Sequence, residues 1–160
     1  DWIDALLGGR VVVSNGPLLR VRVEGHAPGH VFHLQKGEAR EFYIALQLAF
    51  YEQTQVDYLE LVKNGRVEHE IRLDQLAARQ GKLPPLRFDA SGWFLVRAVT
   101  NNADYYQFAS SGPYYVESNY EPRVSSQSVR FFLDWLAAAE QHFADDEAAL
   151  ADIDAAQIFW

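Results

Sequence analysis

The chain has 160 residues and a formal net charge of −8, and it contains neither Cys nor Met. This length supports one domain with a sizeable buried core. The acidic balance argues against nucleic acid, which is bound by clustered Lys and Arg. No apolar run approaches the ~20 residues of a membrane span, and no signal peptide opens the chain. Because there is no initiator Met, we expect a processed product or a piece of a longer protein, cytoplasmic or exported.

Short segments with strand or turn character dominate the first third of the chain. Residues 1–7 predict a short helix that Gly8-Gly9 ends. Strands are predicted where apolar residues alternate or cluster between turn-forming residues, at 10–13, 19–23 and 31–34. The apolar residues that alternate from Phe42 to Phe50 predict one long strand, which we place centrally in its sheet.

The strongest local signal is Asn64-Gly65, which separates two runs rich in β-forming residues. A type I′ hairpin turn needs positive φ at both central positions, which Asn and Gly adopt at least cost. The preferred register then sets the opposing pairs: Val62 and Val67, Glu60 and His69, Tyr58 and Ile71, Val56 and Leu73. It leaves Leu59 and Leu61 on the solvated face. A three-residue turn with a bulge is the alternative; it moves Leu59 and Leu61 to the side of Val67 and Ile71 and sets Glu60 opposite Glu68.

The remaining pattern changes from strands to helices at Pro122. Residues 75–79 predict a helical turn, and strands are predicted at 92–100, 105–108 and 114–117, the first of them central. Ser125 or Ser126 can cap a helix that runs to about Phe143, with a buried stripe of Val129, Phe132, Leu136 and Phe143. A second helix opens at Asp145 and turns Leu150, Ile153 and Gln157 inward. We therefore expect an antiparallel, immunoglobulin-like β-sandwich over 1–122 and a helical segment over 123–160 that packs on it.

Few residues offer chemistry. His26, His30 and His33 form the only His cluster, but zinc sites need three or four protein ligands, and residues 30 and 33 point to opposite faces of a strand. They are weak metal candidates against a solvated loop. A pair of His69 with Glu60 reads as structural rather than as an acid/base dyad.

Arg97 lies on an otherwise apolar strand face, so it either forms a structural salt bridge, which we favour, or contacts an anion in a cleft. Aromatic residues concentrate around it, and such rings suit sugar stacking, a core or an interface. Tyr114 and Tyr115 alternate, so at least one of them is expected inside. No nucleophile, base and orienting group can be named together, so autonomous catalysis is not supported.

Three ordered segments carry a resemblance to a known family. GRVVVSNGP from Gly9 is similar to a G-R-x-x-V-T/S-N/S-G-P opening, and Asp57 to Val67 is similar to a d-x-L-E-L-V-x-N-G-x-V hairpin. Gly92-Trp93 with Arg97, followed by SSGPYYV, resembles a G-W-x-x-x-R … T-S-P-x-Y-V ending, although Ser111-Gly112-Pro113 stands where the family has Ser or Thr before Pro. SSQSVRFFLDWL from Ser125 is similar to a closing helix. The chain thus resembles the β-rich domain after the catalytic module of PHP-type (polymerase and histidinol phosphatase) metallohydrolases of the CehA/McbA kind.

The resemblance implies a non-catalytic accessory domain that packs on a catalytic barrel of the same parent chain and helps shape its substrate cleft. His and Asp ligands of that barrel would hold the divalent metal, and none is expected in this chain. Binding or interdomain candidates are Asn15, Trp93, Arg97, Ser111, Tyr114 and Tyr115. The alternative function is a carbohydrate-binding module that uses exposed Trp and Tyr rings. Substrate class and homo-oligomerisation stay open.

Overall fold

The computed structural model describes residues 1–50, 55–102 and 104–159. The chain divides into two compact units, Asp1–Pro122 and Arg123–Trp160. We call them the β unit and the helical unit, and describe each by itself. In the described ranges, no helix is long and apolar enough to cross a bilayer.

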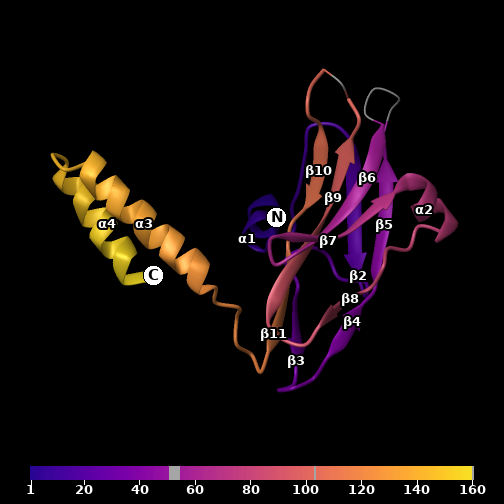
Figure 1. Cartoon of the computed structure of the whole chain (residues 1–160), viewed down its shortest axis with the longest axis horizontal. Coiled ribbons are helices and arrows are strands. Elements are labelled where there is room, and N and C mark those ends of the chain that lie inside the picture. The colour runs from indigo at the N-terminus through magenta and orange to yellow at the C-terminus, as the bar shows by residue number, and fades with distance from the viewer. Residues whose placement is uncertain (51–54, 103, 160) are drawn as a thin grey trace. The chain divides into compact units, whose positions relative to one another are not determined.

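The elements of the β unit follow one another in the order α1 (Trp2–Leu7), β1 (Val12–Ser14), β2 (Leu18–Val23), β3 (Val31–Leu34), β4 (Arg40–Phe42), β5 (Ile44–Ala49), β6 (Val56–Lys63), β7 (Arg66–Arg72), α2 (Leu73–Ala78), β8 (Leu86–Phe88), β9 (Gly92–Thr100), β10 (Phe108–Ser111) and β11 (Tyr114–Ser118). The helical unit holds α3 (Ser126–His142) and α4 (Glu147–Phe159). The expectation of a mainly β chain with helices at its C-terminal end is confirmed (Figure 1).

The largest sheet has seven strands and is built around β9. Strand β6 pairs with β9 along one edge, and β7 lies outside β6. The other edge of β9 is shared by β10 and β11, which pair in turn with β1 and β3. All these pairings are antiparallel except the β11–β3 pair. Pairing on both edges confirms the central place predicted for residues 92–100.

The predicted long strand from Phe42 to Phe50 is wrong. Strand β4 pairs with β8, whereas β5 pairs with β2, and each pair is a separate two-stranded sheet. Tyr43 is the break between them. The alternation of apolar residues is real, because Phe42 and Ile44 are buried. It continues across a point where the chain leaves one sheet for another, and alternation alone cannot detect that change.

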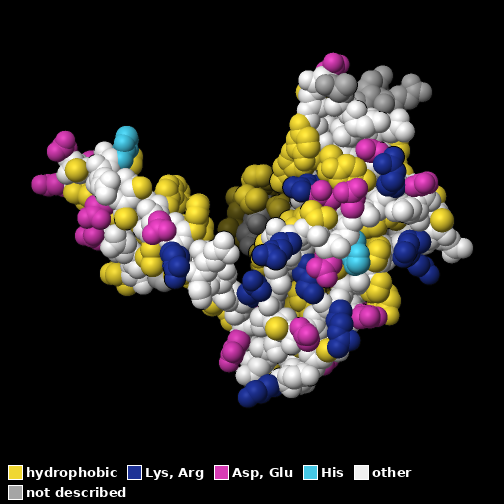
Figure 2. Space-filling view, in the orientation of Figure 1, with side chains coloured by type: hydrophobic (Ala, Val, Ile, Leu, Met, Phe, Trp, Pro, Cys, Tyr) yellow, Lys and Arg dark blue, Asp and Glu magenta, His cyan; other side chains and the backbone are white. Residues whose placement is uncertain are grey.

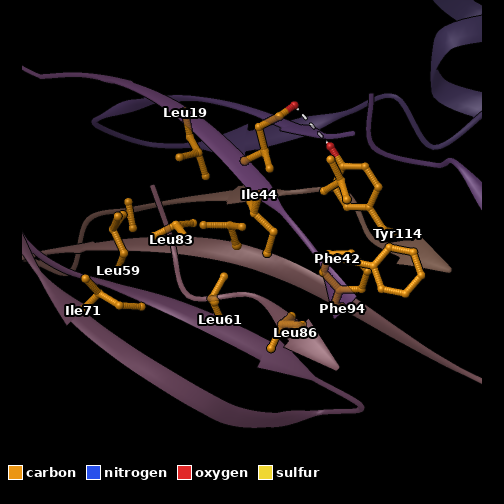
Figure 3. Packing of buried hydrophobic residues seen from close by; sticks show 14 of the residues in the cluster. Leu19, Phe42, Ile44, Leu59, Leu61, Ile71, Leu83, Leu86, Phe94 and Tyr114 are labelled. Carbon is orange, nitrogen blue, oxygen red and sulfur yellow. Dashed lines mark hydrogen bonds between the residues drawn. The ribbon is translucent and has the colours of Figure 1, made fainter. Parts of the chain in front are cut away.

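One hydrophobic core lies between the sheets (Figure 3). Phe94 of β9 stacks on Tyr114 of β11 with ring centroids 5.2 Å apart. The hydroxyl of Tyr114 lies 3.2 Å from the carbonyl oxygen of Val21 on β2 and 3.2 Å from that of His26. A fully buried phenol thus ties the large sheet to the smaller one, which confirms that one of the two adjacent tyrosines lies inside.

The hairpin of β6 and β7 starts in the preferred register and then departs from it, without adopting the alternative that sets Glu60 opposite Glu68. Asn64 and Gly65 have φ of 50° and 85°, and Val62 opposes Val67 as preferred. The register then shifts between Leu61 and Val62. Beyond the shift the preferred pairs are wrong, because the opposing pairs are Leu61 and His69, Glu60 and Glu70, Leu59 and Ile71, Tyr58 and Arg72. The shift turns Leu59 and Leu61 into the core, where both are fully buried. The free energy gained by burying these two leucines exceeds the cost of interrupting the hydrogen-bonded pairing of β6 with β7.

Three backbone segments meet at glycines near the start of the chain. Gly29 has φ of 85°, and a Cβ there would lie 1.8 Å from the carbonyl oxygen of Gly8. A Cβ on Gly112 would lie 2.5 Å from the carbonyl oxygen of Gly9. The amide of Gly112 donates to Val11 at 2.7 Å. Glycine is therefore required where the segment after α1 crosses the loop before β3 and the break between β10 and β11.

The helical unit is a hairpin of α3 and α4. Ser125 caps α3 as predicted, its hydroxyl accepting from the Ser128 amide at 3.3 Å. Val129, Phe132 and Leu136 are partly covered, but Phe143 and Gln157 of the predicted inner faces are exposed. Ile153 is buried as expected.

Candidate functional site

The candidate site is the face of the seven-stranded sheet that points away from the core, here called the outer face. On β9 the even-numbered side chains Phe94, Val96 and Ala98 are buried in the core. The odd-numbered side chains therefore point outward, and directly opposed residues on neighbouring strands share their side. The outer face consists of Trp93, Leu95, Arg97, Val99, Tyr58, Glu60, Val62, Glu70, Phe108, Ser110 and Tyr115.

An ion pair lies across two strands of this face. The Nε atom of Arg97 donates to Glu60 Oε2 at 2.6 Å, and Nη2 lies 2.5 Å from the same oxygen. Glu60 is only 8% exposed, and it stands opposite another acid, Glu70. The guanidinium offsets the repulsion between these two carboxylates. Arg97 thus reaches a carboxylate, as its structural reading predicts.

Apolar and aromatic side chains surround the ion pair. Trp93 and Tyr115 stand directly opposite each other on β9 and β11, and Leu95 stands opposite Val62. Tyr115 is 40% exposed. Tyr106 and Phe108 stack with centroids 5.5 Å apart. Figure 2 shows hydrophobic side chains gathered over β9 and β10, with charged side chains of both signs beside them. The outer face therefore combines apolar area with a specific charged pair.

Burial also alters one phenol on this face. It raises the pKa of Tyr58, and the negative charges of Glu60 and Glu70 raise that pKa further. The Tyr58 phenol therefore keeps its proton, and its ability to donate a hydrogen bond, to higher pH than a solvated tyrosine.

The other three interdomain candidates lie elsewhere. Ser111 is buried, and its hydroxyl accepts from the Val96 amide at 3.1 Å. Tyr114 belongs to the core, where burial raises its pKa to about 12. Asn15 joins two loops, because its side chain donates to the Tyr106 carbonyl at 3.0 Å and accepts from the Phe108 amide at 2.8 Å. These three residues hold the framework on which the outer face is built.

The His cluster does not form a three-ligand set. The rings of His26 and His30 stack with centroids 3.7 Å apart, and both rings contact Phe32 by their edges. His33 instead lies beside Glu117, with Nδ1 3.5 Å from Oε2. Among the residues described, no three His, Cys, Asp or Glu side chains are grouped so as to hold a metal ion. Burial lowers the pKa of His30, and the positive charges of His26 and His33 lower it further against the opposing effect of Glu24.

Sequence reasoning missed Glu60, which it paired with His69. The signal was present in the alternative register, because placing Leu59 and Leu61 in the core turns Glu60 to the other face. An acid so placed next to a central strand is within reach of Arg97. The need to bury Leu59 and Leu61 constrained the register of β6 more strongly than the Asn64-Gly65 turn did.

No protein-family model matches this chain, no curated protein matches it in sequence, and no solved structure matches it.

Proposed function

We propose that the β unit is an immunoglobulin-like β-sandwich serving as a non-catalytic accessory domain of a PHP-type metal-dependent hydrolase. In this proposal the outer face packs against the catalytic barrel of the parent chain and helps shape its substrate cleft. The observation that carries the proposal is the composition of that face, where Trp93, Leu95 and Tyr115 flank the Arg97–Glu60 pair. Aromatic residues and Arg are the types most enriched in protein interfaces.

The arrangement of the resembling segments supports this proposal. The opening segment contacts the ending segment through Val11 with Gly112, and Asn15 binds Phe108 just before that segment. The hairpin turn contacts the Gly92-Trp93 segment, because Asn64 Oδ1 accepts from the Trp93 amide at 3.0 Å. These motifs, far apart in sequence, thus come together in one sheet. The divalent metal and its ligands belong, in this proposal, to the partner domain.

Two experiments test the accessory role. Sequencing the parent gene should find an H-x-H metallohydrolase module upstream of Asp1, and its absence would refute the proposal. In the full-length parent, Leu95→Glu should lower hydrolase activity, whereas in the isolated chain it should leave the fold intact, because Leu95 is only partly buried. Tyr43→Glu is the matched control, since Tyr43 is 63% exposed and outside the seven-stranded sheet.

A second candidate function is carbohydrate binding. It is favoured by the opposed Trp93 and Tyr115 on one sheet face, because aromatic rings on a solvent-facing sheet surface can stack on sugar rings. Affinity electrophoresis through soluble polysaccharides would show retardation that Trp93→Ala abolishes and Tyr43→Ala leaves unchanged. Equal mobility of all three proteins in every polysaccharide would reject this candidate.

A further inference from the structure

A separate cleft runs between strands β1 and β2, at the edges of two different sheets. It is open to solvent, encloses about 450 Å³, and has apolar walls that include Val12, Leu18, Leu19 and Leu48. Val12 and Leu18 are 45% and 67% exposed. The cleft is distinct from the outer face and takes no part in the proposed accessory role.

The strand β1 presents a free backbone edge to this cleft. Val11 accepts a hydrogen bond from Gly112, and the Asn15 amide donates to Phe108, so the backbone groups of alternate residues 11, 13 and 15 point toward β10. Because strand backbone groups alternate in direction, those of Val12 and Ser14 point the opposite way, into the cleft. In the described part of the chain no backbone partner lies against the Val12 amide.

The strand β2 presents a second free edge from the other side. Its residues Val21 and Val23 direct backbone groups away from β5, since Tyr114 reaches the Val21 carbonyl and the Val23 amide donates to His26. Leu19 lies two residues before Val21, so its backbone groups also point away from β5. The bridge between Val23 and His26 closes this edge at one end. The Val21 carbonyl already accepts from Tyr114 and Arg22, so the open part of this edge lies at Leu19.

Three arginines stand at the cleft and the hollow that continues it. They are Arg10, Arg20 and Arg22. The side chains of Arg10 and Arg22 donate to the carbonyl oxygens of Asp4 and Val21, at 3.0 Å and 3.2 Å. Within the described ranges none of the three guanidinium groups pairs with a carboxylate. In a chain with net charge −8, this is a local concentration of unpaired positive charge.

We propose that this cleft binds an extended peptide whose side chains alternate between apolar and acidic, and that the peptide adds as a β-strand to the free edges. Strand addition takes affinity from main-chain hydrogen bonds and specificity from alternate side chains. One side of such a strand meets the apolar walls, and the other meets the arginines, whose guanidinium groups match carboxylates. An unpaired edge on a sheet is the usual template for this mode of binding.

The test uses the whole chain and two synthetic nine-residue peptides, one alternating Val with Asp and one alternating Val with Lys. Calorimetry and amide chemical shifts should show that the Val–Asp peptide binds and perturbs Val12 and Leu19. Arg20→Glu should weaken binding about tenfold or more, because a charge-assisted pair is replaced by repulsion. Lys36→Glu, the same charge change on an exposed turn, should alter binding less than about twofold.

A backbone variant tests the edge itself. Val12→Pro removes the amide that faces the cleft and keeps the groups that face β10, so the sheet should form and peptide binding should be lost. Should that variant fail to fold, Arg20→Glu still decides the outcome. Equal affinity for the Val–Lys peptide, no binding of the Val–Asp peptide, or unchanged binding to Arg20→Glu would overturn the proposal. Concentration-dependent dimerisation that Val12→Pro abolishes would overturn it as well, since the occupant would then be a second copy.

Discussion

Arg97 and Glu60 are held together in the middle of a sheet face, with two guanidinium nitrogens of Arg97 within 2.6 Å of a single carboxylate oxygen of Glu60. Glu60 is nearly inaccessible to water, whereas the Arg97 side chain is 37% exposed. The buried Glu60 carboxylate therefore needs its ion-pair partner more than the partly exposed Arg97 guanidinium does. Removing Arg97 leaves a buried carboxylate without its partner, and this asymmetry can be measured.

We expect Arg97→Leu to lower the free energy of unfolding by about 2 kcal/mol, and Arg97→Lys by about 1 kcal/mol, because Lys cannot reproduce the guanidinium geometry. The double variant Glu60→Leu with Arg97→Leu should recover to within about 1 kcal/mol of the wild type, since no charge is then left buried. Urea unfolding of the four proteins measures these differences. A double variant less stable than either single variant would contradict this account.

Tyr114 should give the protein a specific sensitivity to alkali. Its folded pKa is raised from 10.0 to about 12 by burial, so the folded state holds its proton more tightly than the unfolded chain. The stabilising effect is complete below pH 10 and is lost as pH rises toward 12. Tyr114→Phe should flatten this decline, and it should cost about 1–2 kcal/mol at pH 7 because the buried hydroxyl's hydrogen bonding to the Val21 and His26 carbonyls is lost. Denaturation followed from pH 8 to pH 12 by circular dichroism provides the measurement, with Tyr43→Phe as the exposed control.

Gly29 and Gly25 form a matched pair for testing the glycine contact. Both have positive φ, 85° and 86°, so Ala is strained to a similar degree at either position. A Cβ at Gly25 meets no atom within 4 Å, whereas one at Gly29 lies 1.8 Å from the Gly8 carbonyl oxygen. Gly25→Ala should cost about 1 kcal/mol. Gly29→Ala should cost about 3 kcal/mol or more, or prevent folding, because backbone must move. Similar melting temperatures for the two variants would contradict the contact.

Acid should weaken the fold through His30. Its folded pKa lies below 6.5, so the unfolded chain binds the proton more readily. The contribution to stability is complete above pH 6.5 and is lost as pH falls through the lowered folded pKa. His30→Gln should reduce the slope of unfolding free energy against pH between 6.5 and 4.5. A slope unaffected by His30→Gln would contradict this role of His30.

Local signals allowed much of the β unit to be predicted from sequence. Asn64-Gly65 fixed a turn because few other residues adopt positive φ at two successive positions. The alternation around Val21 and the apolar run from Gly92 to Thr100 predicted strands that form. The register shift near Leu61 and the break at Tyr43 were not predictable from short patterns, because both depend on the sheet that receives the side chains.

The candidate site was predictable only in part. Trp93 and Arg97 share a face because strand parity places them there, and parity can be read from sequence, whereas Tyr115 joins them only through the pairing of β11 with β9. Glu60 required the correct register of another strand, and the buried roles of Ser111 and Tyr114 required the pairing of β10 and β11 with β9. Long-range pairing is what single-sequence reasoning lacks.

The central claim is that the outer face is covered by a catalytic domain in the parent protein. Hydroxyl-radical footprinting with mass spectrometry measures this directly on Trp93, Leu95 and Tyr115, in the isolated chain and in the full-length parent. We predict that these three side chains react in the isolated chain and are protected in the parent, while Tyr43 reacts equally in both. Equal reactivity of Trp93, Leu95 and Tyr115 in the two proteins would contradict the claim.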